Sequence, residues 1–330
     1  MSLPGVLEGR LSIPVVASPL FISSGPELVI AQCQAGVVGS FPALNARPVS
    51  VLGDWLDRID EELRDFCAGH PGRPVAPYAV NQIVHRSNDR LDADMARVVD
   101  HRVPIVITSL GARAEINDAV HSYGGIVLHD VIDDRFARKA IEKGADGLIA
   151  VAAGAGGHAG TQSPFALLQE IRSWFDGPLL LSGSIAHGRT ILAAQVAGAD
   201  LAYVGSAFLA TDEANAFAGY KQMIVESTAA DIVNSNLFTG VHGNYLRGSI
   251  EAAGLDPDDL PESDPSAMDW GSGGNTEAKA WKDIWGCGQG IGAIDAIVPA
   301  AELVARLTRE YDEAVRRMAT LARRGMALSA

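Results

Sequence analysis

Short, continuously apolar runs recur along the first two thirds of the chain, and helical patterns separate them. Buried parallel strands are expected to be apolar at every position rather than at alternate ones. Eight runs fit that description: Pro14–Ala17, Val37–Ser40, Tyr78–Asn81, Ile105–Thr108, Ile126–His129, Leu148–Val151, Leu179–Ser182 and Ala202–Gly205. Eight strands that alternate with helices predict an α/β fold, the (β/α)8 TIM barrel. A flavodoxin-like open sheet is the alternative, but it normally uses fewer strands.

The segments between these runs have the pattern of amphipathic helices. Residues Asp133–Lys143 place charged side chains on one face, and the opposite face carries Phe136, Ala137, Ala140 and Ile141. Two helices are expected to end in the same Gly-Ala-Asp turn, at residues 144–146 and 198–200, before the next strand begins. This repetition indicates a weak internal repeat of one helix–strand unit.

After Thr211 the pattern changes, so we divide the chain into three parts. Residues 1–211 are expected to form the barrel, and residues 212–285 a small helical subdomain that covers one end of it. Within the subdomain, a loop rich in Pro, Asp, Ser and Gly is expected from Asp256 to Gly274. Residues 286–330 are expected to pack back on the barrel through a helix, Pro299–Arg324. Its apolar positions are Leu303, Leu307, Tyr311, Val315, Met318 and Leu321.

Composition limits the class of protein. With 330 residues, of which 48% are hydrophobic, the chain can bury a large core. A formal net charge of -14 argues against nucleic acid or an anionic membrane as a partner. Three cysteines without metal spacing predict a reduced, cytoplasmic protein, and the scattered histidines predict no metal site. We see no signal peptide and no membrane span; the oligomeric state stays open, a homodimer included.

A glycine-rich stretch with one histidine follows the sixth apolar run. Residues Gly154–Gly160 contain Gly157 and His158, so a group that titrates near neutral pH stands next to open backbone. Such an arrangement suits a flat ligand that lies beside a proton acceptor. The alternative is an ordinary glycine-rich turn with a surface histidine.

The ends of the seventh and eighth runs predict an anion site. In TIM barrels, phosphate groups commonly bind after these two strands. Here they end in Gly183-Ser184 and Gly205-Ser206, which offer backbone N–H groups and hydroxyls. We therefore expect a phosphate cradle made of these four residues, with two ordinary strand–turn–helix joints as the alternative.

Three other strand ends carry candidate ligand contacts. The carboxamide of Asn81 can present a donor and an acceptor to a heteroaromatic edge, or it can be a capping residue. His129 and Asp130 are either a hydrogen-bonded pair or part of a cofactor wall. Small residues after the first strand admit a planar ring; they are Ala17, Ser18, Pro19 and Leu20.

Taken together, these segments resemble the nitronate monooxygenase family, formerly the 2-nitropropane dioxygenases, which are FMN-dependent TIM barrels. The matching stretches are residues 18–20, 79–81, 156–160, 182–189 and 198–211, and the late motif Gly288–Gly292 also matches. Four positions depart from the family pattern. Ser184 replaces a second glycine, Ser206-Ala207 replaces Thr-Arg, the first loop lacks its usual methionine, and Asp130 stands where some relatives have lysine.

The resemblance implies FMN as cofactor, with its phosphate at Gly183, Ser184, Gly205 and Ser206. It implies flavin contacts from residues 17–20, Asn81, His129 and Gly157, His158 as the catalytic residue, and a substrate pocket near Gln289 and Gly290. The implied reaction is oxidation of alkyl nitronates, or of nitroalkanes, by O2. Two alternatives stay open: an NAD(P)H-dependent quinone or enoyl-acyl-carrier-protein reductase of the same fold, and a flavin-binding protein without enzyme activity.

Overall fold

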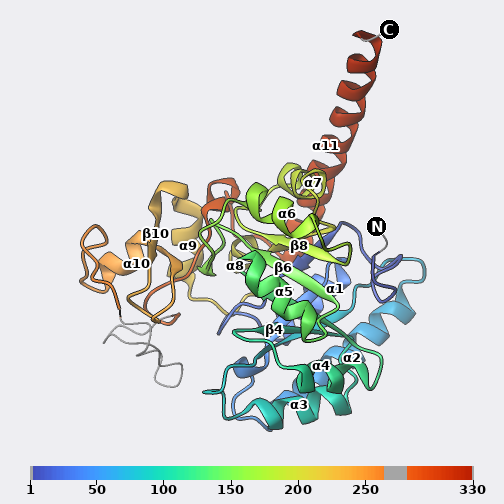
Figure 1. The fold of residues 1–330 in the computed structure, drawn as a ribbon, viewed down its shortest axis with the longest axis vertical. Coiled ribbons are helices and arrows are strands. Elements are labelled where there is room, and N and C mark those ends of the chain that lie inside the picture. Colours follow the sequence, from blue (N-terminus) through green and yellow to red (C-terminus); the bar gives the residue numbers. More distant parts are fainter. Residues whose placement is uncertain (1–2, 264–280, 329–330) are drawn as a thin grey trace.

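The computed structural model describes residues 3–263 and 281–328, with side chains up to Arg324, and its core is a parallel β-barrel. The strands run in the spatial order β1-β9-β8-β6-β5-β4-β3-β2, and a parallel bridge between Val16 and Val38 joins β1 to β2. This closed ring confirms the TIM barrel and excludes an open sheet (Figure 1). The strands lie within two residues of the predicted ends; they are β1 Val15–Ala17, β2 Gly39–Pro42, β3 Tyr78–Ile83, β4 Ile105–Ser109, β5 Ile126–Val131, β6 Gly147–Val151, β8 Leu179–Ser182 and β9 Leu201–Val204.

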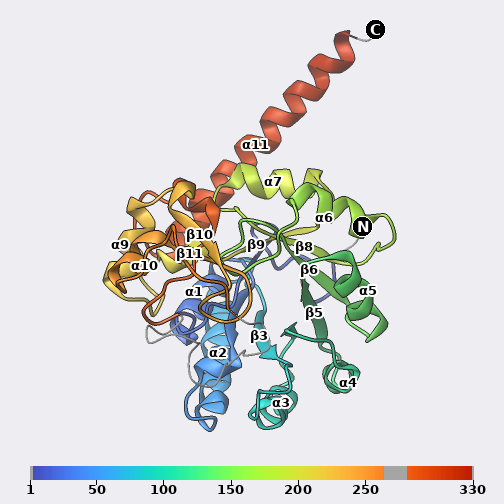
Figure 2. The same cartoon turned by 60° about the vertical axis from the view of Figure 1, so that its left-hand side comes forward.

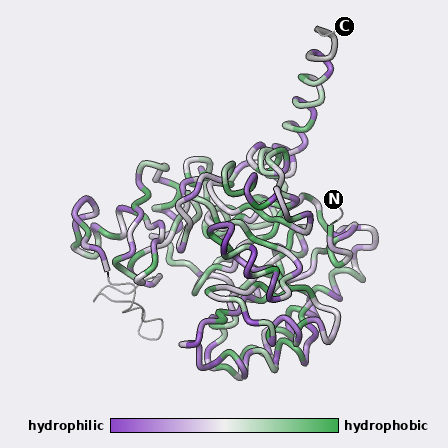
Figure 3. The backbone as a smooth tube through the Cα atoms, viewed as in Figure 1, coloured by the Kyte–Doolittle hydropathy of each residue, from purple (hydrophilic) through white to green (hydrophobic). Residues whose placement is uncertain are grey.

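Helices surround the barrel, and two apolar layers result. Side chains inside the ring, such as Val16, Ile107 and Leu180, form one buried cluster, and the opposite faces of the strands pack against the helices in a larger one. Apolar and polar residues alternate along the outer helices (Figure 3). They are α1 Pro26–Gln34, α2 Val51–Gly69, α3 Leu91–Asp100, α4 Ala114–His121, α5 Asp134–Glu142, α6 Pro164–Arg172, α7 Gly188–Val196 and the short α8 Ser206–Leu209, with a 3-10 turn at Ala43–Asn45.

The two Gly-Ala-Asp turns are structurally equivalent. Gly144 and Gly198 adopt φ values of 93° and 114°, which favour glycine. The Asp146 carboxylate accepts a hydrogen bond from the backbone N–H of Val127 at 2.7 Å, and Asp200 accepts one from Leu179 at 2.8 Å. Each aspartate therefore ties the start of its own strand to the preceding strand, as the sequence repeat indicated. In α5, Ala137 and Ala140 are buried as expected, but Phe136 is 40% exposed.

The segment after Thr211 contains helices, as expected, and also two strands that we did not expect. Helices α9 (Ala218–Glu226) and α10 (Arg247–Ala252) and a 3-10 turn (Ala229–Asp231) flank β10 (Ile232–Ser235) and β11 (Gly243–Leu246). Strand β11 pairs with both β10 and β7, a two-residue strand at Gly157–His158. The inserted segment is thus joined to the glycine-rich loop of the barrel by an antiparallel sheet. Of the predicted Asp256–Gly274 loop, residues 264–274 lie outside the described part of the chain.

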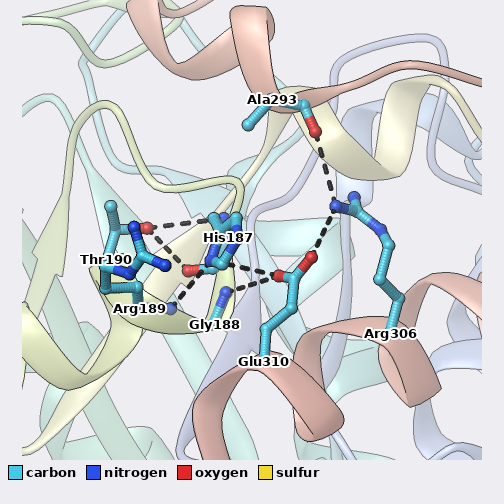
Figure 4. Close-up of polar contacts among 7 residues, drawn as sticks. All are labelled: His187, Gly188, Arg189, Thr190, Ala293, Arg306 and Glu310. Atoms are coloured by element: carbon cyan, nitrogen blue, oxygen red, sulfur yellow. Dashed lines mark hydrogen bonds and ion pairs between the residues drawn. The ribbon is translucent and has the colours of Figure 1, made fainter. Parts of the chain in front are cut away.

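The first half of the final helix, α11 (Ala300–Leu328), is anchored to the barrel (Figure 4). Glu310 accepts a hydrogen bond from the N–H of Gly188 at the start of α7 (2.8 Å), and its other oxygen pairs with Arg306 at 3.1 Å. Gly188 lies against the α11 backbone, since an added Cβ would come within 2.2 Å of the Tyr311 nitrogen. The Tyr311 hydroxyl also donates to Gln195 of α7 at 2.6 Å. The direction of α11 is therefore set by α7.

The second half of α11 extends away from the body of the molecule (Figure 2). Leu303 and Leu307 are buried, whereas Val315, Met318 and Leu321 are 40%, 47% and 48% exposed. The prediction that the whole apolar stripe packs on the barrel is therefore wrong beyond Ala314, because the helix leaves the body of the molecule there. Among the described residues, no helix carries an apolar stretch long enough to cross a bilayer.

Candidate active site

The carboxyl ends of β1, β9, β8 and β6 are neighbours in the ring, so the predicted ligand segments come together there. The N–H of Ser18, after β1, donates to Val204 of β9 at 2.8 Å. A Cβ added to Gly205 would lie 3.4 Å from the Ser18 Cβ and 3.6 Å from Leu20. The first loop and the start of α8 thus form one surface. We call the rim formed by the carboxyl ends of the eight strands the barrel mouth.

The four residues of the predicted phosphate cradle lie side by side after β8 and β9. Gly183 and Ser184 both have positive φ, 134° and 57°, and the Ser184 side chain is exposed. Ser206 begins α8; the N–H of Phe208 in its first turn donates to the Gly205 carbonyl at 2.8 Å, which leaves the N–H groups of Ser206 and Ala207 for a ligand. The Ser206 hydroxyl accepts a hydrogen bond from the N–H of Gly288 at 2.9 Å. Hydroxyls and helix N–H groups are donors that suit a phosphate group.

The late Gly288–Gly292 motif reaches the same place from the other end of the chain. It contains a 3-10 turn, Gln289–Ala293. The N–H of Gln289 donates to the carbonyl of Gly154 at 2.9 Å, and a Cβ on Gly290 would approach the Ser184 carbonyl carbon within 2.9 Å. Both residues of the predicted substrate pocket therefore lie against the cradle, and the Gln289 side chain is exposed.

A polar chain crosses three adjacent strands on the inner face of the barrel. The Asn81 Nδ2 (β3) donates to the Ser109 Oγ (β4) at 2.7 Å and to the Ile107 carbonyl at 3.1 Å. The Ser109 hydroxyl donates to Asp130 Oδ2 (β5) at 2.6 Å. Burial raises the pKa of Asp130 to about 6, against the opposing effect of the hydrogen bonds from Ser109 and the Leu110 N–H. The sequence had pointed to Asp130 as a partner of His129 or as part of a cofactor wall, but not to Ser109.

His129 does not face the barrel mouth. Side chains alternate along a strand, and His129 has the parity of Val127 and Val131, which pack against the helices. Its Nδ1 is hydrogen-bonded to the Thr108 hydroxyl at 2.6 Å, and burial lowers its pKa to about 4. The two side chains lie on opposite faces of β5, so they are not a hydrogen-bonded pair, and the His129 side chain points away from the predicted cofactor site.

His158 lies between the barrel and the inserted segment. Its Nε2 is hydrogen-bonded to the Thr239 hydroxyl at 3.0 Å, and its ring packs edge-on against Trp281, with 5.3 Å between the ring centroids. Burial lowers the pKa of His158 to about 4, so the imidazole is neutral at pH 7. The simple expectation of a surface histidine in a turn is therefore wrong.

Gly157 makes room for the same tryptophan. Its φ is 67°, and an added Cβ would lie 2.9 Å from the Trp281 ring. The Trp281 ring in turn packs near Tyr245 of β11, with 5.8 Å between centroids. The glycine thus admits Trp281, a reason that the motif alone did not indicate. In the described part of the chain, no three His, Cys, Asp or Glu side chains are grouped as metal ligands.

The comparisons with known proteins agree with this geometry. The sequence model described as nitronate monooxygenase matches residues 54–310. A nitronate monooxygenase of Paraburkholderia phytofirmans is 27% identical over 344 residues, covering 92% of this chain and 94% of that protein. A nitronate monooxygenase of Metarhizium robertsii is 26% identical over 343 residues and covers 91% of each chain.

Solved structures show the same fold. The nitroalkane oxidase of Streptomyces ansochromogenes superposes with a TM-score of 0.78 at 24% identity, covering 95% of this chain and 100% of that chain. FabK from Thermotoga maritima gives 0.76 at 21% identity, covering 97% and 100%. Fold and site together define an enzyme of the TIM-barrel class, an oxidoreductase. The chain belongs to the nitronate monooxygenase family, whose members are flavin enzymes.

Proposed function

We propose that the protein binds FMN at the barrel mouth and oxidises alkyl nitronates with O2. The observation that carries this proposal is the convergence of three segments from distant parts of the chain: the cradle residues after β8 and β9, the glycine-rich loop with His158, and the Gly288–Gly292 motif. The matching family and its relatives are described as nitronate monooxygenases, which supports a nitronate as the substrate.

The residues present fit a flavin mononucleotide. The Ser184 hydroxyl and the N–H groups of Ser206 and Ala207 are donors for one phosphate group. Asn81 and the backbone of Ala17 to Leu20 are the contacts we assign to the ring. No Gly-x-Gly-x-x-Gly fingerprint for a dinucleotide follows the first strand. When bound, FMN supplies the redox chemistry, taking electrons from the substrate carbon and passing them to O2.

His158 is the group we assign to proton transfer. The Thr239 hydroxyl donates to the Val241 carbonyl at 3.1 Å, so it can accept a hydrogen bond from the Nε2–H of His158. Because the imidazole is neutral at pH 7, it can take a proton from the α-carbon of a neutral nitroalkane. A neutral ring provides no positive charge, which favours the role of base over that of an electrostatic anchor for the nitronate.

The test is an anaerobic titration of the purified protein, followed by flavin absorbance. We expect yellow protein that releases FMN rather than FAD on denaturation, and bleaching of the bound flavin by an alkyl nitronate. Rapid bleaching by NADH or NADPH, with none by the nitronate, would instead support the reductase alternative. A protein that is colourless and cannot be reconstituted with FMN would refute the proposal.

A further inference from the structure

Resting on the proposed FMN site, we propose that Ser109 and Asp130 are positioning residues that orient the Asn81 amide. They hold it so that its Oδ1 faces the ligand as a hydrogen-bond acceptor. An acceptor at this point favours a ring that can donate a hydrogen bond to the Asn81 Oδ1. In oxidised flavin, the single ring N–H is at N3. Ser109 and Asp130 would thus determine ring recognition through Asn81.

The Asn81 amide has no donor left to offer to a ligand. A carboxamide carries two N–H groups. One is donated to the Ser109 Oγ at 2.7 Å and the other to the Ile107 carbonyl at 3.1 Å. In the described part of the chain, no donor is recorded on the Asn81 Oδ1, and this atom is not among the enclosed, unpartnered ones. The oxygen is the amide atom that remains for a ligand.

Asp130 fixes the direction of the hydrogen bonds that run from Asn81 through Ser109 to Asp130. An ionised carboxylate accepts only, so the Ser109 hydroxyl donates its one hydrogen to Asp130 Oδ2 at 2.6 Å. The Ser109 oxygen can then only accept, and Asn81 must turn its NH2 group toward it. A flipped amide would bring the Asn81 oxygen against the Ile107 carbonyl, two acceptors in contact, and would leave buried groups unpaired.

The surroundings of Asp130 are consistent with a carboxylate at mildly alkaline pH. The Leu110 N–H stabilises the charged form, and burial opposes it, which gives the pKa of about 6. Tyr203 on β9 interacts with Asp130, and burial raises the pKa of Tyr203, so it stays neutral. Measurements at pH 8 therefore examine the ionised form of Asp130.

The experiment compares binding of FMN with binding of FMN methylated at N3, by quenching of flavin fluorescence. We expect the wild-type protein to bind the methylated form at least roughly tenfold more weakly, because a methyl group cannot donate to Asn81. Ser109→Ala and Asp130→Ala should weaken FMN binding by roughly five- to tenfold while changing binding of the methylated form little. The ratio of the two dissociation constants should therefore shrink.

Two conservative variants and one control separate positioning from a merely structural role. Ser109→Thr keeps the hydroxyl, so it should restore most of the ratio, whereas Asp130→Asn can donate as well as accept and should shrink the ratio as Asp130→Ala does. The control is Thr108→Val, which removes the neighbouring buried hydroxyl of β4, hydrogen-bonded to His129 on the opposite face. It should lower the melting temperature and leave the ratio unchanged.

The outcomes are distinguishable. A wild-type ratio in folded Ser109→Ala and Asp130→Ala variants would overturn the positioning role, even if both bind FMN less well. An equal loss of ratio in Thr108→Val would do the same. Wild-type protein that binds no FMN would instead refute the proposed function, and this inference with it.

Discussion

The buried carboxyl of Asp130 makes the free energy of unfolding depend on pH. Its pKa in the folded protein is about 6, above the value of about 3.9 for an unfolded chain. Between these two values the folded state holds a proton that the unfolded state has lost. The free energy of unfolding therefore falls as pH rises through this window.

We accordingly predict that Asp130→Asn stabilises the protein at pH 8 but not at pH 4. The amide does not titrate, so the variant avoids the cost of the buried charge, roughly 3 kcal/mol for a pKa difference of about two units. Denaturant unfolding of both proteins at the two pH values measures this difference. An effect of equal size at pH 4 and pH 8 would show that the titration of Asp130 is not its cause.

His158 carries the prediction about turnover. His158→Ala should keep bound FMN while lowering turnover by roughly 10²–10⁴, the usual effect of losing an acid–base group. The loss should be largest with neutral nitroalkane, which needs deprotonation, and smaller with preformed nitronate.

The control for His158 is Thr239→Val, which removes the hydrogen-bond partner but leaves the imidazole. It should lower turnover far less. Near-normal rates of His158→Ala on both substrate forms would mean that the residue only joins the barrel to the inserted segment.

At the scale of elements, the eight barrel strands were predictable because each is a continuous apolar run, buried on both faces. Strands β7, β10 and β11 were not, because none of them is a continuous apolar run, and β7 pairs with β11 about 85 positions away along the chain. The same limit applies to the site. The cradle could be located from the order of the strands. By contrast, whether Asp130 points into the barrel and His129 out of it depends on which residue of β5 is the first to pair with the neighbouring strand.

The joint between β7 and the inserted segment gives a prediction for Gly157. Gly157→Ala should strain the backbone and displace Trp281, since the new Cβ would lie 2.9 Å from its ring. We expect a fall in melting temperature together with weaker substrate turnover. The matched control is Gly124→Ala, where φ is also positive (86°) but nothing lies within 4 Å of the added Cβ. If both variants lose the same stability and no turnover, contact with Trp281 is unimportant.

At the scale of the whole molecule, scattered histidines and cysteines without ligand spacing predict a reaction that needs no metal ion. The described residues hold no cluster of metal ligands. Activity should survive treatment with EDTA, measured by O2 consumption with a nitronate. Loss of activity that a divalent ion restores would contradict this prediction.

The projecting half of α11 has a consequence for the action of proteases. Isolated helices of fewer than about 12–15 residues are marginal in water, so this half should open often. It carries Arg316, Arg317, Arg323 and Arg324, all exposed, whereas Arg306 in the anchored half is paired with Glu310. Limited digestion with trypsin, followed by mass spectrometry, should therefore first remove the chain beyond Arg316 or Arg317 and leave the bond after Arg306 intact. The trimmed protein should keep its melting temperature. Early cleavage within the barrel, with the bonds after Arg316 and Arg317 intact, would contradict this prediction.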